Sequence, residues 1–350
     1  MGWPVYERFD VPLAELTTLR LGGPAKRLVE VDDTADLVEV LRACDAEREP
    51  VLVLGGGSNV VVADEGFPGT VVQVRTRGIQ VESDSACGGA AVRVSAGENW
   101  DRFVVHAIGQ GWVGVEALSG IPGLAGAAPI QNVGAYGQEV AQTLAQVRAW
   151  DRVDSVVRTI PVAECGFGYR TSRFKRTPER YVVLEVVFQL EKGDLGAPVR
   201  YAELARTLGV EIGQRAPLAD VRTAVLGLRR GKGMVLDADD HDTWSVGSFF
   251  TNPIVAAEIA ASLPVDAPRW PSGDGQVKTS AAWLIERAGF GKGHGDGVVR
   301  LSTKHTLALT NRGGAATTDL LRLAREVREG VRTKYGIELV NEPVLVGCAI

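Results

Sequence analysis

The stretch from Ser119 to Gly137 reads SGIPGLAGAAPIQNVGAYG, and it decides how the rest of the chain is interpreted. It is rich in glycine and alanine and carries no charged side chain. Loops of this length without secondary structure of their own are uncommon in compact domains and usually serve a function. We therefore expect this loop to be buried against a bound group, such as a ring system and its phosphates.

A second glycine-rich run, GGGSN from Gly55 to Asn59, joins two apolar strand-like segments, Val51–Leu54 and Val60–Ala63. Glycine permits positive φ and close backbone approach, and successive N–H groups can form a nest that binds anions. Taken alone, a plain turn is an equally good interpretation. Together with the long loop, however, this run predicts a cofactor of the dinucleotide type.

A literal GxGxxG pattern from Gly109 to Gly114 points away from a nucleotide site. The Rossmann motif requires a strand before it and a helix after it, so that the helix N-terminus meets the pyrophosphate. Here a helical pattern, which Asn99 can cap, precedes the motif, and a loop follows. We therefore interpret Gly109 or Gly111 as the C-terminal cap of that helix.

Composition and charge set limits on the function. A chain of 350 residues should hold two or three domains, and a net charge of −5 weighs against nucleic-acid binding. No apolar run approaches the roughly 18 residues of a membrane span, and the N-terminus lacks the pattern of a secretory signal. Four scattered cysteines without a CxxC pair predict reduced thiols, and the spacing of the four histidines predicts no metal site. We expect a cytoplasmic protein without membrane insertion.

The pattern of apolar residues predicts an α+β protein without regular βαβ alternation. Valine-rich strands dominate the first part of the chain, and helical patterns dominate after a loop near residue 191. The strands are expected at 28–31, 71–75, 79–81, 92–96, 147–150, 156–160, 181–190, 306–310 and 339–346, and the helices start at 34 and 99 and span 218–229, 256–263, 280–288 and 318–335.

Five motifs, taken in order, resemble the family of UDP-N-acetylenolpyruvoylglucosamine reductases over nearly the whole chain. They are TLRLGGPA (Thr18–Ala25), the run Gly55–Asn59, the run Gly120–Gly137, FGYRTSRFK (Phe167–Lys175) and GSFFTNP (Gly247–Pro253). The resemblance implies an FAD-binding fold of the vanillyl-alcohol oxidase (PCMH) type. It also implies non-covalent FAD, NADPH as hydride donor, and reduction of UDP-N-acetylglucosamine enolpyruvate to UDP-N-acetylmuramate in peptidoglycan precursor synthesis.

The resemblance also implies a division of the chain. Two FAD-binding subdomains are expected at 1–70 and 71–205, a substrate-binding domain at 206–315, and a C-terminal helix and strand at 316–350 that return to the active site. The segment RYAEL around Tyr201 resembles an insertion that folds over the substrate in one branch of the family. The chain is accordingly expected to be of the lid-containing subtype and to act as a monomer.

Three residues match the family's catalytic positions. Arg170 matches an arginine that clamps the substrate carboxylate, and a guanidinium suits this role because it binds carboxylates bidentately and stays charged. Ser248 matches the proton donor, although a serine hydroxyl needs a polarising partner to act as an acid. Glu342 matches a C-terminal glutamate near the enolpyruvyl group, with the least defined role of the three.

The binding residues are carried over in the same way. Ala127 and Ala128 stand where many relatives have serine, so flavin phosphate contacts there are expected from backbone N–H groups, and Trp270 replaces a tyrosine. The residues expected at the substrate are Tyr201, Lys232, Asn252, Trp270 and Lys278. Those expected at the cofactor are Gly55, Gly56, Gly57, Ser58, Asn59, Ser119, Gly120, Ile121, Pro122, Gly123, Gly126, Ala127, Ala128, Ile130, Gln131, Asn132, Gly134, Ala135 and Tyr136.

Two other functions compete with this interpretation. One is a flavin oxidase of the same fold that acts on a small alcohol or sugar, which oxygen consumption with a simple sugar would support. The other is a nucleotide-sugar binding protein that has lost the flavin and would be colourless. The motif around Ser248 and the match at Glu342 favour the reductase over both.

Overall fold

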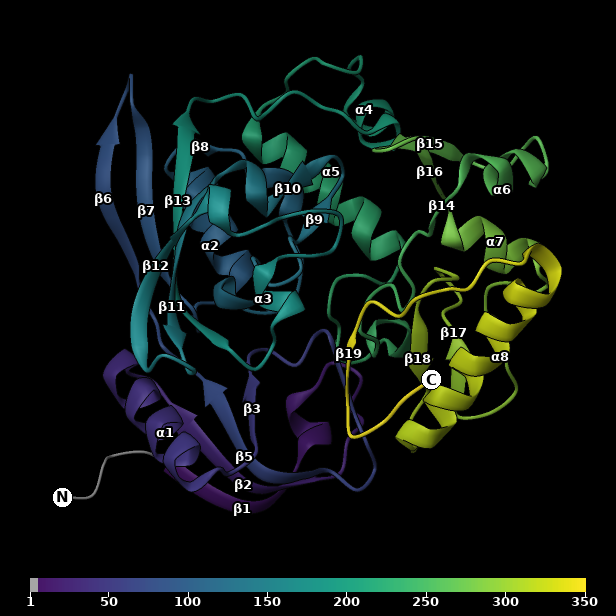
Figure 1. Cartoon of the computed structure of the whole chain (residues 1–350). Helices are drawn as coiled ribbons and strands as arrows, with labels where there is room; N and C mark the ends of the chain where they lie inside the picture. The colour runs from purple at the N-terminus through teal and green to yellow at the C-terminus, as the bar shows by residue number, and fades with distance from the viewer. Residues whose placement is uncertain (1–5) are drawn as a thin grey trace. The chain divides into compact units, whose positions relative to one another are not determined.

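The computed structural model describes residues 6–350, so part of the N-terminal stretch considered above for a secretory signal lies outside the described residues (Figure 1). The chain folds into two units, and each is made of separate stretches. Unit 1 combines residues 6–11, 25–56 and 68–231, and unit 2 combines residues 12–24, 57–67 and 232–350. Because these stretches alternate along the chain, each unit is assembled from segments that lie far apart in the sequence.

The first layer of unit 1 is a four-stranded sheet with the order β1-β2-β5-β3 and one helix, α1. The helix begins where the sequence provides a cap, since the Asp33 carboxylate accepts hydrogen bonds from the N–H groups of Ala35 and Asp36. It ends at Arg48, which adopts a left-handed conformation with φ 56°. The bounds are β1 Tyr6–Pro12, β2 Pro24–Val31, α1 Thr34–Glu47, β3 Val51–Leu54 and β5 Phe67–Val74.

The second layer of unit 1 is a sheet with the strand order β12-β11-β13-β7-β6, to which β8 adds at β13. Helix α2 lies on one face of it (Figure 1), and its Phe103 ring stacks on Phe188 of β13 with 4.9 Å between the ring centroids. Trp100 completes this aromatic cluster. The bounds are β6 Ile79–Ser85, β7 Gly89–Ser95, α2 Trp100–Gly109, β8 Trp112–Val113, β11 Leu144–Asp151, β12 Val156–Pro161 and β13 Tyr181–Lys192.

Short elements and the three helices α3, α4 and α5 complete unit 1. Val199, Leu204 and Val225 form a small apolar cluster between α4 and α5, next to the start of the long glycine-rich loop. The bounds are η2 Glu116–Leu118, η3 Ala125–Ala127, β9 Gly134–Ala135, β10 Gln138–Glu139, η4 Val140–Gln142, η5 Val162–Glu164, α3 Arg173–Arg176, α4 Ala202–Leu208 and α5 Leu218–Gly231.

Unit 2 is organised around α8, whose apolar face carries Leu320, Val327 and Val331, all wholly buried. The Asp64 carboxylate caps this helix by accepting hydrogen bonds from the N–H groups of Thr317 and Thr318. The bounds are η1 Leu13–Leu16, β4 Val60–Val62, η6 His241–Thr243, β14 Ile254–Val255, α6 Ala257–Ser262, β15 Arg269–Ser272, β16 Gln276–Thr279, α7 Ala281–Arg287, β17 Val299–Leu301, β18 Leu309–Asn311, α8 Thr317–Tyr335 and β19 Val344–Val346.

The expected elements mostly agree with the structure, and the misleading glycine motif is one of the confirmed predictions. Helix α2 ends at Gly109, and Gly111 adopts a left-handed φ of 69° just beyond it. Two strand predictions are wrong. The strand expected at 306–310 begins only at Leu309, because residues 305–308 form a turn in which Ala308 N–H donates to the carbonyl of His305.

The strand expected at 339–346 is the second error, since the continuous strand β19 covers only Val344–Val346 and Asn341 forms no more than an isolated bridge. Pro343 has no N–H to give to a ladder, and β19 starts directly after it. It pairs with β4 in parallel, with Val344 opposite Val60. Among residues 6–350 no helix combines the length and the apolar character needed to cross a membrane.

Candidate active site

The two glycine-rich runs meet within unit 1. A Cβ atom added to Gly56 would lie 2.9 Å from the Cα atom of Gly123, and one added to Gly55 would lie 3.4 Å from the Leu124 side chain. The first run is also where the chain passes between units, since Ser58 belongs to unit 2. Glycines at this junction therefore allow two backbones to touch without a side chain between them.

The second half of the first run is held by unit 2. Gly57 has φ 60°, and a Cβ atom there would lie 1.9 Å from the carbonyl oxygen of Leu16. The carbonyl of Gly57 accepts a hydrogen bond of 3.1 Å from Thr18 N–H, and that of Asn59 accepts one of 3.0 Å from Val344 N–H. The run is thus fixed in unit 2 by an N-terminal turn and by the C-terminal strand β19.

The long loop packs closely against neighbouring segments of unit 1. A Cβ atom on Gly126 would lie 2.5 Å from the Cβ atom of Ala96, and Gly126 N–H donates to the carbonyl of Ala96. The N–H groups of Ala127 and Ala128 donate within the turn, to the carbonyls of Leu124 and Ala125. Some of the small residues in this loop are therefore needed for packing within the fold. Their contact with a cofactor stays a prediction.

The end of the long loop is shaped by Asn132, which is 1% exposed and has φ 50°. Its amide donates to Glu139 Oε2 over 2.8 Å and to the carbonyl of Gly168 over 3.2 Å, and its amide oxygen accepts from Ala141 N–H. Asparagine tolerates the left-handed conformation better than most residues. The side chain of this predicted cofactor residue therefore ties the loop to the segment that contains Arg170.

Arg170 is attached to the same loop. Its Nη2 donates a 2.7 Å hydrogen bond to the carbonyl of Gly134, and its Nη1 donates one of 3.4 Å to the carbonyl of Asn132. The residue itself adopts a φ of 52°, and Ser172 Oγ donates to the carbonyl of Ile130. These bonds fix the direction of a planar guanidinium, as required of a group that must clamp a carboxylate.

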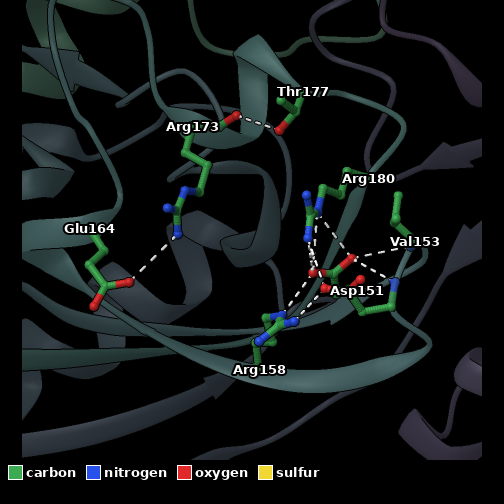
Figure 2. A network of polar contacts seen from close by, with 8 residues as sticks. Asp151, Val153, Arg158, Glu164, Arg173, Thr177 and Arg180 are labelled. Carbon is green, nitrogen blue, oxygen red and sulfur yellow. Dashed lines mark hydrogen bonds and ion pairs between the residues drawn. The ribbon is translucent and has the colours of Figure 1, made fainter.

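A buried ion network holds the far end of the Arg170 segment (Figure 2). Asp151 is wholly buried at the end of β11, and its carboxylate accepts 2.8 Å hydrogen bonds from Arg158 Nε and Arg180 Nη2. Burial alone would raise the pKa of this carboxyl, but the hydrogen bonds from Arg180 and Arg158 outweigh it and hold the pKa below its ordinary value. The network therefore joins the β11–β12 turn to the start of β13.

In unit 2, the segments of Ser248 and Glu342 are neighbours. Glu342 N–H donates a 2.8 Å hydrogen bond to the carbonyl of Phe249, and Phe250 forms a β-bridge with Asn341. Both phenylalanines are buried, and their rings lie 5.1 Å apart between centroids. The sequence Gly-Ser-Phe-Phe thus anchors its aromatic pair in the core and presents Ser248 beside the C-terminal segment.

Three of the predicted substrate residues gather on the small sheet β14-β16-β15 of unit 2. Trp270 and Lys278 are direct cross-strand partners, so their side chains share one face, and Ile254 is the next residue in that row. Asn252 lies just before β14 and accepts a hydrogen bond from Ala281 N–H. The structure brings these three together, whereas the other two predicted substrate residues stand elsewhere in the chain.

Lys232 follows α5 directly, at the first residue of the last unit 2 stretch. Tyr201 belongs to unit 1 and is 45% exposed. Its ring stands edge-on to Tyr136, the last predicted cofactor residue, with 5.6 Å between centroids and 88° between planes. Burial raises the pKa of Tyr136 to about 12, so this phenol stays protonated at neutral pH.

Comparison with known proteins identifies the family. A family model for the C-terminal domain of UDP-N-acetylenolpyruvoylglucosamine reductase matches residues 239–346, and one for an FAD binding domain matches residues 25–160. The chain is 59% identical to the UDP-N-acetylenolpyruvoylglucosamine reductase of Cutibacterium acnes, covering 97% of this chain and 90% of that protein. It is 58% identical to the enzyme of the same name from Thermobifida fusca, covering 97% and 98%.

The chain belongs to the UDP-N-acetylenolpyruvoylglucosamine reductase family. A solved structure supports this assignment at the level of the fold. The crystal structure of UDP-N-acetylenolpyruvylglucosamine reductase (MurB) from Thermus caldophilus matches with a TM-score of 0.66 at 26% identity, and the match covers 98% of each chain. The expected FAD-binding fold of the PCMH type is thereby confirmed.

The described residues fit the flavin dinucleotide that this family binds. The matched FAD-binding region contains both glycine-rich runs, and Gly56 and Gly123 meet there with no side chain between them. Gly120 and Gly123 have φ of 71° and 112°, conformations that L side chains rarely adopt. Glycine-rich turns of this kind can form the backbone N–H nests that bind phosphate groups.

Sequence reasoning missed the charged residues that hold the long loop from behind. Asp101, in the first turn of α2, accepts a 2.6 Å hydrogen bond from Gly120 N–H and a two-pronged ion pair from Arg222. Arg229 is largely buried nearby, and this burial lowers the pKa of Arg229 to about 10, while the negative charge of Asp101 acts in the opposite direction. In the sequence these residues look like ordinary solvent-facing charges on two helices.

Proposed function

We propose that this chain catalyses the NADPH-dependent reduction of UDP-N-acetylglucosamine enolpyruvate to UDP-N-acetylmuramate, in the cytoplasm, as a step of peptidoglycan precursor synthesis. Membership of the reductase family supports the proposal. The observation that carries it is the anchoring of Arg170 to the glycine-rich loop by hydrogen bonds to the carbonyls of Asn132 and Gly134. That attachment ties the carboxylate clamp to the loop that would hold the flavin.

When bound, FAD would supply the hydride chemistry of the reaction, and the residues of this chain would supply three further physical contributions. A cation must bind the enolpyruvyl carboxylate, an acid must protonate the carbon next to it, and the substrate must be held in register. Arg170 supplies the cation, because its guanidinium can bind both carboxylate oxygens and remains charged throughout. The negative charge that develops in the reaction is delocalised into this carboxylate, so Arg170 stabilises it there.

Ser248 donates the proton in this proposal, and Glu342 assists it. A serine hydroxyl is a weak acid, so it needs a polarising group or a water chain. The hydrogen bond from Glu342 N–H to the carbonyl of Phe249 supports such a partnership, since it keeps the two segments adjacent. Glu342 then adjusts the charge around the hydroxyl or the delivery of the proton.

Substrate binding is assigned to the diphosphate and the sugar. Lys232 and Lys278 act as point charges toward phosphate oxygens, and Asn252 and Tyr201 act as donors. Trp270, paired with Lys278 across β15 and β16, presents an aromatic surface. Because Tyr201 lies in the segment that resembles the family's substrate-covering insertion, we assign the chain to the lid-containing subtype. We also propose a monomer, which sedimentation of the purified protein would test.

The two half-reactions test the assigned roles separately. The variant Ser248→Ala should keep reduction of bound FAD by NADPH but lose reoxidation by the enolpyruvyl substrate by about 100-fold or more, the range of a lost general acid. Stopped-flow absorbance of the flavin measures both steps. Ser262→Ala, an exposed serine on α6, is the matched control. Equal losses in both half-reactions would contradict the role of Ser248.

The carboxylate clamp is tested by Arg170→Lys. One ammonium cannot reproduce a two-pronged fork, so we expect a loss of about tenfold or more in kcat/KM for the enolpyruvyl substrate. Arg173→Lys, three residues further along the same segment, makes the same chemical change at a guanidinium that forms a loose 3.8 Å ion pair with Glu164. Equal effects of the two substitutions would argue against a clamp at Arg170.

A further inference from the structure

Glu116 is a buried carboxylate for which the proposed reaction has no use. It lies in η2, ahead of the long glycine-rich loop, and its side chain is 0% exposed. Its Oε2 accepts a 2.7 Å hydrogen bond from Gly114 N–H, and its Oε1 accepts bonds of 2.6 Å from Ala197 N–H and 2.8 Å from Gln138 Nε2. A buried carboxylate needs such compensation, because removing it from water is costly.

The donors of Glu116 come from both ends of the long loop and from a third segment. Gly114 precedes the loop, and Gln138 follows its last residue. Gln138 also binds the backbone next to Glu116, since its Oε1 accepts a 2.8 Å hydrogen bond from Ala117 N–H. Ala197 is 81 residues away from Glu116 along the chain and lies in the stretch 195–201, which we call the strap.

The strap also lies against the end of the long loop, away from Glu116. Gly196 is so close that a Cβ atom there would lie 2.8 Å from Glu116 Oε1. At the other end, a Cβ atom on Gly137 would lie 2.9 Å from the Cβ atom of Arg200, and the Tyr201 ring meets Tyr136. The first part of the strap therefore contacts Glu116, and its last residues contact the end of the long loop.

We propose that Glu116 is a positioning residue that fixes the strap, and with it the Tyr201 side chain, against the end of the flavin-binding loop. The inference rests on the proposed function, in which Tyr201 binds the substrate diphosphate. Glu116 holds both loop ends and the strap through one carboxylate, so any shift of the loop is passed to the strap and back. In this arrangement the binding of flavin and the placement of the substrate-covering segment are coupled.

Only a carboxylate satisfies this arrangement. It accepts at both oxygens, whereas a glutamine has one acceptor and one donor group. In Glu116→Gln, the amide NH₂ faces either Gly114 N–H or the pair formed by Ala197 N–H and Gln138, so at least one buried donor loses its acceptor. Leaving a buried donor unsatisfied is expected to loosen the affected segment about tenfold.

A double variant isolates the strap. In Glu116→Gln with Gln138→Glu, the new carboxylate at 138 accepts from Ala117 N–H and from the amide at 116, and the amide oxygen at 116 faces Gly114 N–H. Ala197 N–H is then the donor that loses its acceptor. The matched control is Glu191→Gln, the same chemical change at an exposed glutamate next to the strap.

The experiment measures amide hydrogen exchange of the strap in the FAD-loaded protein, with β13 as internal reference, together with KM and kcat for the UDP-enolpyruvyl sugar. In the double variant we expect exchange in 195–201 and KM each to rise about tenfold, while kcat and flavin content change less than twofold. In Glu116→Gln the rise in exchange falls on whichever segment has lost its acceptor, the strap or the stretch around Gly114. Wild-type exchange in the strap of the double variant would overturn the proposal. A uniform rise that includes β13 would overturn it too, since it would show general loosening.

If Glu116→Gln does not fold, Gly196→Ala carries the test from the strap side. The added methyl group would lie 2.8 Å from Glu116 Oε1, so the strap and the carboxylate must move apart and their contact is disturbed. The same exchange and KM changes are expected, and unchanged exchange would contradict the proposal. Tyr201→Phe separates the inference from the proposed function: an unchanged KM in that variant counts against the substrate role of Tyr201, whereas strap exchange alone decides whether Glu116 anchors the strap.

Discussion

Two carboxylates in unit 1, Asp151 and Glu116, are both wholly buried, and the protein compensates them in opposite ways. Asp151 lies between the guanidinium groups of Arg158 and Arg180 and receives two backbone N–H bonds as well (Figure 2). Glu116 accepts hydrogen bonds from two backbone N–H groups and one amide side chain, none of them charged.

The difference shows what each carboxylate is suited to do. The arginines around Asp151 are 37% and 43% exposed, so water can replace the carboxylate if the network opens. The donors around Glu116 are uncharged groups from three segments that meet at a carboxylate with no exposed surface. A charge network of the first kind adds local stability at a sheet edge, whereas the second kind enforces one arrangement of three segments.

Alanine substitution should give the largest difference in stability between the two carboxylates. We expect Glu116→Ala to lower the free energy of unfolding by about 3–5 kcal/mol, because it leaves several buried donors unsatisfied and a cavity behind. Asp151→Ala should cost only about 1–2 kcal/mol, because its partners regain water. Urea unfolding of the FAD-loaded protein measures both values. A cost for Asp151→Ala equal to that of Glu116→Ala would remove the distinction drawn here.

A pH series should sharpen the comparison with a smaller effect. The pKa of Asp151 in the folded protein lies below its unfolded value of about 3.9, so its contribution to stability is complete above that pH and is lost as the pH falls toward the folded pKa. In Asp151→Asn this part of the acid destabilisation should disappear. Unfolding midpoints measured from pH 6 to pH 3 test this, and parallel curves for the variant and the wild type would contradict it.

Salt should produce the smallest change. At 1 M salt the screening length is about 3 Å, so the partly exposed arginines should interact less strongly with Asp151. The stability difference between wild type and Asp151→Ala should therefore narrow between 0.05 and 1 M NaCl. The difference between wild type and Glu116→Ala should stay constant, because no cation takes part. Urea unfolding at the two salt concentrations provides the check, and a salt-dependent Glu116 difference would count against our description.

Local signals in the sequence predicted much of the fold. Asp33 and Asn99 cap α1 and α2 as expected, and the helix before Gly109 ruled out a Rossmann site. These predictions succeed because capping and helix termination depend on residues within one turn. The strand expected at 339–346 failed because pairing depends on a distant partner, and only β19 lies beside β4.

The candidate site divides in the same way. The sequence by itself determined the cofactor class and the family, because glycines and motif residues at set spacings report on the chemistry they serve. Only the tertiary structure revealed Asp101 behind Gly120, and Glu116 between the loop and the strap. Their partners are up to 121 residues away, as Arg222 is from Asp101, and an acidic residue in a helical turn looks the same in sequence whether it meets water or buried N–H groups. Folding makes that distinction, because it decides which donors are deprived of water and must find an acceptor within the protein.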